Sequence, residues 1–323
     1  MNRKFLSSPI ILILPSILAI GFVIIIPLIF SFYTSFTSYK LTRPDSLYNF
    51  VGLRNYERLI YNAKFWYAFG RTILFLAVVL NLELLFGLGI ALLINKITWG
   101  QRTLRTIMMF PMMFSPILVG FQWKYIFNDN IGLLNNFLYL FGYESAIAWL
   151  IDKKLAMGSI MVAEIWANTA IFSILLLAGL IGIPRDPIEA ARVDGCNSWQ
   201  VFKHITLPFL MPFIFIALTI RSLDVGRAYD IVHIMTGGGP AMRTELIWTM
   251  IARVGYKDAN MGYANAMSYV SIILSIDSIF CSAYAHAKTQ VDLAILLLSL
   301  ICFEIFRALL VYSIALLKSR INV

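Results

Sequence analysis

Charged residues are scarce in this sequence. About 60% of its 323 residues are apolar and only 13% are Asp, Glu, Lys or Arg, whereas soluble domains contain about 25% charged residues. So few charges cannot cover a water-facing surface, which excludes a soluble enzyme and indicates a membrane protein. The net charge of +9 therefore favours basic loops at a membrane surface over a nucleic-acid-binding face.

Cysteine and histidine are also rare. The three cysteines, Cys196, Cys281 and Cys302, lie far apart and predict neither a disulfide framework nor a zinc site. The three histidines form no HExxH or His-x-His pattern. A GxxxxGK[ST] phosphate-binding loop is missing as well. We therefore expect no metal and no cofactor in this chain.

Long apolar runs dominate instead. A helix crosses the hydrocarbon core of a bilayer, about 30 Å thick, with roughly 20 apolar residues. Six windows of this kind are 9–33, 72–94, 106–123, 155–183, 208–224 and 264–285. A seventh, 293–317, carries Glu304 and Arg307 and predicts either a further crossing or an interfacial helix. We predict an all-α, polytopic membrane protein with one transmembrane domain over 1–287 and an apolar C-terminal tail over 288–323.

The first window predicts an uncleaved membrane anchor, because it is long and no small-x-small cleavage site closes it. Arg3 and Lys4 precede it, and a short later loop holds Lys96, Arg102 and Arg105. Cytoplasmic loops are enriched in such residues, so we expect the N-terminus to lie in the cytosol.

Three long loops, 34–71, 124–154 and 225–263, contain aromatic and amphipathic runs in place of low-complexity tracts. Such composition favours short helices at the membrane surface.

The loop 184–208 has helix-forming signals of its own. Pro187 suits the first turn of a helix and Asp186 suits its cap. Gly195 can adopt a positive φ and end the helix. The pattern predicts a short helix over 187–194.

A second helix follows in the same loop. Asn197 or Ser198 can cap it, and Pro208 is expected to end it where the next apolar window begins. On the first helix Ala190 and Ala191 form a small, flat patch. Two interpretations stay open from these residues: a helix resting on lipid headgroups, or a docking site for another protein.

The same segment resembles the EAA motif of permease subunits in binding-protein-dependent ABC importers. The matching residues are Glu189, Ala190, Ala191, Asp194, Gly195, Ile205, Leu207 and Pro208. Further matches to the sugar-importer branch, related to the maltose, lactose and glycerol-phosphate permeases, are FVGLRNYERLIYNAKFWYAFGRT (50–72), Trp123 through IGLLNNFL, TGGGPAMRTE (236–245) and GYANAM (262–267). The resemblance covers about residues 5–275.

The resemblance implies a six-helix ABC importer permease core in the bacterial inner membrane, moving a carbohydrate by alternating access without covalent chemistry. The implied partners are a second homologous permease subunit, two ATP-binding subunits that hold ATP and Mg²⁺, and an extracytoplasmic sugar-binding protein. The implied ATPase-coupling residues are Glu189, Ala190, Ala191 and Gly195, with Arg192 and Asp194 at the rim.

The glycine run Gly237, Gly238 and Gly239, followed by Pro240, is similar to the outer loop of this family. Its Lys-free sequence does not suit a phosphate-binding loop. We expect a tight turn with a structural role, and contact with the binding protein is the alternative.

Polar side chains within the apolar windows mark the candidate substrate path, because they are costly against lipid. The candidates are Trp166, Asn168, Thr169, Ser173, Thr219, Arg221, Asp224, Tyr229, Tyr263, Asn265, Ser268 and Ser271. Ser, Thr and Asn also pack membrane helices together, and Arg221 and Asp224 can pair across one turn. Both alternatives stay open.

Two rival functions also stay open. One is a permease for another solute such as glycerol phosphate, with Arg221 reading the anionic group. The other is an ion-coupled carrier in which Asp224 relays protons.

Overall fold

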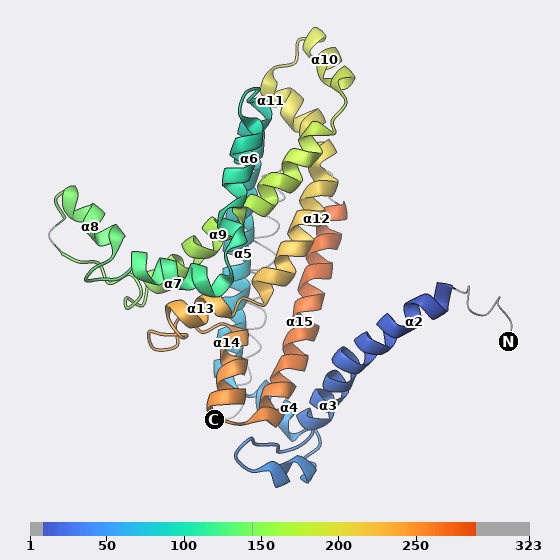
Figure 1. The fold of residues 1–323 in the computed structure, drawn as a ribbon, viewed down its shortest axis with the longest axis vertical. Helices are drawn as coiled ribbons and strands as arrows, with labels where there is room; N and C mark the ends of the chain where they lie inside the picture. Colours follow the sequence, from blue (N-terminus) through green and yellow to red (C-terminus); the bar gives the residue numbers. More distant parts are fainter. Residues whose placement is uncertain (1–8, 144, 289–323) are drawn as a thin grey trace. The chain divides into compact units, whose positions relative to one another are not determined.

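The structure is a computed structural model that contains two compact units (Figure 1). It describes the backbone of residues 9–143 and 145–288 and the side chains of residues 13–143 and 145–274. The first unit combines residues up to Asn62 with residues 251–273, and the second combines residues 63–250 with those from 274 onward. The division into a membrane domain and a tail at residue 288 stays a prediction.

The first unit begins with one long helix, made of α2 (Pro9–Ile20), the π-helical turn η1 (Gly21–Ile25) and α3 (Ile26–Ser35). Pro27 is the second residue after the π turn, in the first turn of α3. A proline removes one helical donor and crowds the preceding turn, so local widening of the helix lets the chain continue. The predicted window 9–33 is thus a continuous helix, two residues longer than expected at its C-terminal end.

The remainder of the first unit is short elements. The 3₁₀ turn η2 (Pro44–Tyr48) and α4 (Arg54–Ile60) follow α3, and η5 (Arg253–Lys257) precedes the start of α15 (Met261–Lys288). Gly262 sits where a side chain would collide with backbone, because a Cβ there would lie 2.3 Å from the carbonyl oxygen of Thr37. The glycine of the GYANAM run therefore lets α15 pack against the chain that leaves α3.

Three long helices form the centre of the second unit: α5 (Ala63–Lys96), α9 (Leu155–Ile181) and α12 (Leu207–Gly226). They pack against one another (Figure 1). Fully buried side chains at their contacts include Phe75, Leu84, Phe172, Leu176 and Leu210. Membrane helices gain little from apolar burial alone, so close packing of such side chains holds the bundle together.

Glycines bring these helices close. A Cβ at Gly87 of α5 would lie 2.4 Å from the Cβ of Phe172 on α9, and one at Gly179 would lie 2.7 Å from the ring of Phe213 on α12. Small residues at such positions let helix backbones approach closely in a membrane.

The window 106–123 does not form the single continuous helix that its apolar length predicts. The chain forms α6 (Gln101–Met109), the 3₁₀ turn η3 (Pro111–Met113) and α7 (Pro116–Ile126) instead. Pro111 and Pro116 account for the break, because neither can donate a helical hydrogen bond. Ser115 then caps α7 by accepting the backbone N–H of Leu118 at 3.4 Å.

The long loops contain the short helices that the sequence predicts. The loop 124–154 holds α8 (Leu133–Leu140), and the loop 225–263 holds α13 (Asp230–Met235) and α14 (Ile247–Ala252). Asp152 accepts the backbone N–H groups of Lys154 and Leu155 just before α9, and these hydrogen bonds lower the pKa of its carboxyl.

Four helices within the described residues are long and apolar enough to cross a membrane. They are Ile13–Ser35, Ala63–Lys96, Leu155–Ile181 and Ser198–Gly226. The predicted window 264–285 falls inside α15, a helix of 28 residues. The predicted seventh window, 293–317, lies outside the described residues. An all-α, polytopic architecture is therefore confirmed.

Candidate functional site

The loop between α9 and α12 forms two short helices, α10 (Arg185–Val193) and α11 (Ser198–Val201). Within the second unit, α10 lies beyond the ends of α9 and α12, at the end opposite to α13 (Figure 1). Gly195 has φ of +84° and ends the first helix. This left-handed conformation suits glycine because other residues meet steric strain there. The predicted role of Gly195 in the turn is confirmed.

The N-terminus of the second helix is closed by two reciprocal hydrogen bonds. The Oδ1 atom of Asn197 accepts the backbone N–H of Gln200 at 2.9 Å, and the Oε1 atom of Gln200 accepts that of Asn197 at 2.7 Å. This reciprocal pair is a capping box and confirms the sequence prediction for Asn197. It fixes the direction in which the chain enters α12.

Two details of the loop differ from the sequence prediction. The first helix begins at Arg185, and Pro184 occupies the cap position without a side-chain bond, so Asp186 lies in the first turn and is not the cap. Pro208 does not end the second helix, because a π turn, η4 (Phe202–Thr206), joins α11 to α12. Widening of the helix at that turn accommodates the missing N–H of the proline.

The surface of α10 is open. None of its residues is buried within this chain. Val193 is 87% exposed, and Trp199 on the neighbouring α11 is 66% exposed. Glu189, Ala190 and Arg192 are exposed beside them, while Ala191 is half-buried. A charged, partly apolar surface of this kind is typical of a binding surface.

A buried cluster of charges lies between the three central helices. The Nε and Nη2 atoms of Arg221 on α12 donate to Glu83 on α5 at 3.0 and 2.8 Å, and Nη2 also donates to Glu164 on α9 at 3.0 Å. The side chains of Arg221 and Glu83 are 3% and 0% exposed. Buried charges are costly, but the planar guanidinium donates to both carboxylate oxygens of Glu83, and this bidentate pairing offsets the cost. The cluster therefore ties α5, α9 and α12 to one another.

The predicted pairing of Arg221 with Asp224 is present but secondary. Their nearest charged atoms are 3.7 Å apart, a longer contact than either glutamate makes. The Oδ1 atom of Asp224 also lies 3.2 Å from the Nη2 atom of Arg227.

A cavity of about 440 Å³ adjoins the charged cluster. Its polar walls come from α9, α12 and the start of α13, and include Glu164, Asn168, Arg221, Asp224 and Tyr229. Its apolar walls come from the broken region between α6 and α7, and include Met112, Phe114 and Pro116. Irregular backbone at membrane depth is typical of a segment that lines a cavity.

Four predicted path residues, Asn168, Arg221, Asp224 and Tyr229, therefore meet at one cavity. Asn168 donates to the Oε1 atom of Glu164 at 3.0 Å, and Tyr229 stacks on His233 with 5.1 Å between ring centroids. The cavity combines amide, carboxylate and aromatic groups, which are suited to bind hydroxyl-rich molecules.

The other predicted path residues lie elsewhere. Thr169 and Ser173 are buried and donate to carbonyls of their own helix at 2.6 and 3.0 Å. Trp166 is 41% exposed and meets Trp123 edge to face at 5.7 Å, and Thr219 is exposed. For Thr169 and Ser173 the alternative of helix packing therefore describes the structure better.

Four further candidates belong to the first unit. Asn265 donates to Thr34 at 2.6 Å, and Tyr263 is buried and accepts a hydrogen bond from Asn62 at 2.7 Å. Ser268 and Ser271 donate to carbonyls of α15 at 3.0 and 2.7 Å. The contacts of Asn265 and Tyr263 join distant segments of the first unit, whereas the two serines bond within α15.

Glu83 and Glu164 are the important residues that sequence reasoning missed. Each lies inside an apolar window, and acidic residues inside a membrane span are functional candidates by default. That signal was present in the sequence. Their common partner was not visible, because Arg221 is separated from Glu83 by 138 positions along the chain.

The glycine run forms the predicted tight turn. Gly237 and Gly238 have φ of +61° and +89°. The hydroxyl of Thr244 donates to the carbonyl of Gly239 at 2.5 Å and lies 2.7 Å from the hydroxyl of Thr236. Arg71 on α5 also donates to the carbonyl of Met242. The turn is thus anchored on α5, and the predicted tight turn is confirmed, while its role stays a prediction.

Asn135, in the IGLLNNFL run, organises the loop 124–154. Its Nδ2 atom donates to the carbonyls of Asp129 and Ile147, both at 3.0 Å, and its Oδ1 atom accepts from Trp149 Nε1 at 2.9 Å. The side chain is 2% exposed. One buried amide therefore closes the loop beside α7.

The family model described as the binding-protein-dependent transport system inner membrane component matches residues 83–286, which include the loop 184–208 and the cavity. The chain belongs to this family. It is therefore a multi-pass permease subunit of an ABC importer in the inner membrane. The four long apolar helices agree with this assignment.

Individual relatives agree with it. The chain is 35% identical over 263 residues to the trehalose/maltose transport system permease protein MalF of Thermococcus litoralis, covering 81% of this chain and 88% of that protein. It is 30% identical over 261 residues to the trehalose transport system permease protein SugA of Mycobacterium tuberculosis, covering 80% and 81%.

A solved structure has the same fold. It is a bacterial ABC transporter involved in the import of the acidic polysaccharide alginate, which matches with a TM-score of 0.76 and 21% identity over 89% of this chain and 97% of that chain.

Proposed function

We propose that this permease carries a carbohydrate, delivered by an extracytoplasmic binding protein, through a path that includes the cavity beside Arg221. The observation that carries the proposal is the extent of similarity to MalF, 35% identity over four fifths of the chain. The cavity supports it, because Asn168, Asp224 and Tyr229 offer hydrogen-bonding groups and an aromatic face in one place.

We further propose that α10 and α11 dock on an ATP-hydrolysing subunit. The exposed surface of α10 supports this, together with the left-handed glycine that sets the angle between the two helices. ATP and Mg²⁺ then bind on two such subunits, a second homologous permease completes the membrane pore, and this chain itself is not an enzyme. The N-terminus and the docking loop lie on the cytosolic side in this arrangement.

The helix that leaves the docking loop supplies a path for movement. It is continuous from Ser198 to Gly226. Arg221 lies 23 residues after Ser198, which is roughly 35 Å along a helix. Because Arg221 is bound to α5 and α9, a displacement of α11 is transmitted to the charged cluster at the cavity.

The same contacts favour an uncharged solute. In the glycerol-phosphate alternative Arg221 reads an anion, but its guanidinium is already bound by Glu83 and Glu164. Asp224 and Asp230 add two carboxylates to the cavity wall, whereas Arg227 adds one further positive charge. An excess of carboxylates repels anions in a low-dielectric site. We therefore propose a neutral sugar as the substrate class.

Co-purification with the ATPase subunit tests the docking surface. Glu189→Lys and Gly195→Val are expected to lower the amount of ATPase subunit retained by at least several-fold, while membrane insertion is unchanged. The first change reverses a charge at the contact, and the second introduces strain at a positive φ.

The matched control is Gly142→Val. Gly142 also has a positive φ, +87°, with nothing within 4 Å of an added Cβ, and it lies outside the docking loop. Full ATPase retention in both loop variants, or equal loss in the control, would contradict the docking assignment.

Transport itself is tested in proteoliposomes that contain the assembled importer. Uptake of the sugar should require ATP and stop when the catalytic residue of the ATPase partner is replaced. Uptake that persists with an inactive ATPase would support an ion-coupled carrier instead.

A further inference from the structure

The first unit contains a cavity of its own, with a volume of about 580 Å³. It is lined by the chain that follows α3, by one face of α4 and by the turn before α15. All of its lining residues belong to the first unit.

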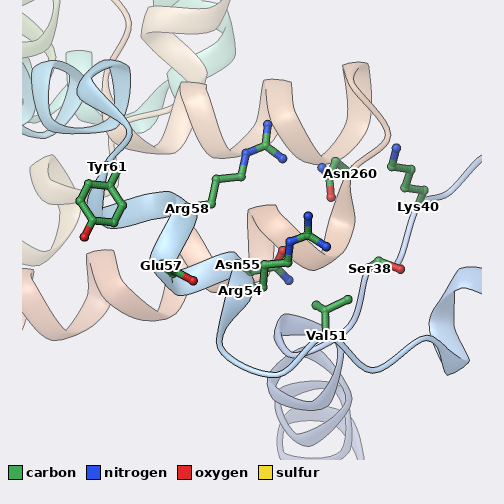
Figure 2. A pocket seen from close by; sticks show the side chains of 9 residues that line it. All are labelled: Ser38, Lys40, Val51, Arg54, Asn55, Glu57, Arg58, Tyr61 and Asn260. Carbon is green, nitrogen blue, oxygen red and sulfur yellow. The ribbon is translucent and has the colours of Figure 1, made fainter. Parts of the chain in front are cut away.

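Three positively charged residues and one acidic residue, Glu57, line this cavity. Figure 2 shows the side-chain ends of Lys40, Arg54 and Arg58 gathered around Asn260, whereas Glu57 points away from them. Arg54 and Arg58 are four residues apart on α4, so they share one helix face, where like charges repel each other. An anion between them removes this repulsion.

The cavity is held in place before any ligand binds. The side-chain amide of Asn55 donates to the carbonyls of Ser35 and Thr37 at 2.8 and 2.9 Å, which ties α4 to the end of α3. The guanidinium of Arg58 lies 4.7 Å from the ring centroid of Tyr263, a cation–π contact that orients it. The charged groups are thus pre-organised.

The surroundings place the cavity at a membrane surface. The first spanning helix, Ile13–Ser35, has 23 residues, which is about 35 Å and enough to cross the hydrocarbon core. Lys40 follows five residues after the end of that helix. Large apolar and aromatic side chains near the cavity are exposed: Tyr48 by 81%, Leu53 by 68%, Phe50 by 65% and Tyr61 by 60%. Such side chains beside basic residues are typical of the lipid headgroup layer.

We propose that this cavity binds the phosphate of an anionic phospholipid headgroup. Arg54 and Arg58 hold the phosphate oxygens, Lys40 adds a third cation, and the exposed rings lie against the lipid. Arginine suits this role because its planar fork matches phosphate geometry. The exposed apolar rings distinguish a lipid from an acidic protein surface, for which charge alone is sufficient. The proposal does not depend on which solute the permease carries.

Native mass spectrometry of the assembled importer tests this site. The protein is equilibrated in micelles that contain equal amounts of phosphatidylglycerol and phosphatidylcholine. The wild-type assembly is expected to retain phosphatidylglycerol preferentially. The double variant Arg54→Gln with Arg58→Gln is expected to lower that retention at least several-fold, and Lys40→Gln alone is expected to lower it less.

Arg43→Gln is the matched control, because Arg43 is exposed on the same loop and does not line the cavity. Unchanged retention in the double variant, or an equal loss in the control, overturns the proposal. If the double variant fails to assemble, Lys40→Gln decides in the same way.

Two competition arms separate other ligands. Displacement of phosphatidylglycerol by millimolar inorganic phosphate would mean a site for soluble anions and would overturn the lipid assignment. Weaker capture of the binding protein by the double variant, with lipid retention unchanged, would mean a protein contact and would overturn it too.

Discussion

At the scale of single residues, the charged cluster joins the three central helices of the second unit. Arg221 satisfies two glutamates on two other helices, and all three side chains are almost completely removed from solvent. Each helix contributes one charge that is costly to bury alone. The cluster therefore stabilises one arrangement of α5, α9 and α12 over others.

Arg221→Leu is expected to destabilise the protein by about 3–5 kcal/mol, because it leaves two buried carboxylates without their cation. Thr219→Ala, an exposed position on the same helix, serves as the control. Thermal unfolding of the purified assembly measures both. The triple variant Glu83→Leu, Glu164→Leu and Arg221→Met should be less destabilised than Arg221→Leu alone, because it leaves no buried charge without a partner. Equal stability of Arg221→Leu and the wild type would contradict the importance of the cluster.

Asn135→Ala is expected to open the loop 124–154. The change leaves the indole N–H of Trp149 and two backbone carbonyls without their partner, at about 1–3 kcal/mol for each buried group that stays unsatisfied. Hydrogen exchange across residues 129–149 should increase. Asn136→Ala, at the exposed neighbouring position, is the control and should leave exchange unchanged. Unaltered exchange in Asn135→Ala would show that the loop closes without this amide.

At the scale of elements, helix approach and helix continuity determine what the second unit can do. Gly87 and Gly179 let α5 and α12 approach α9 to distances that exclude a side chain. The π turn η4 lets one helix run from the docking loop past Pro208 to the cavity. Close contact and continuity together make a stiff connection between the two sites.

Gly87→Ala is expected to push α5 and α9 apart, because the added Cβ would lie 2.4 Å from the Cβ of Phe172. We expect a loss of stability of about 1–3 kcal/mol, as is usual for overpacking. Gly89→Ala is a closely matched control on the same helix, since nothing lies within 4 Å of its added Cβ. Thermal unfolding compares the two, and equal melting temperatures would refute a close contact at Gly87.

At the scale of the whole molecule, the chain is one part of an importer. Its family is defined by dependence on a binding protein, so transport requires more than this subunit. Within the chain, the proposed docking surface on α10 and the cavity lie at different places in the second unit, and α12 leads from the loop that contains α10 to the cavity.

The charge of the cavity predicts solute preference. Uptake of radiolabelled sugar by the reconstituted importer should be inhibited by excess neutral disaccharide and not by glycerol phosphate. If glycerol phosphate were taken up, the proposal of an uncharged substrate would be wrong, although the chain would still be a permease. Absence of any ATP-dependent uptake, with all partners present, would count against the transport proposal itself.

The sequence by itself determined the class of protein, the long helices and the two short helices of the loop 184–208. These depend on local properties: apolar length for a span, glycine for a positive φ, and asparagine followed by glutamine for a capping box. The same local rules failed at two places. Over 106–123 the apolar length predicted one helix, but Pro111 and Pro116 break it. At Pro208 the proline predicted a helix end, but the helix continues through the π turn η4.

Only the tertiary structure decided which polar residues meet. Thr169, Ser173 and Asn168 lie on the same helix and look alike in sequence, yet Asn168 alone among them lines the cavity. The ion cluster joins residues 57 and 138 positions apart. Which helix faces meet follows from close packing at Gly87 and Gly179, a contact between distant segments that no local pattern encodes.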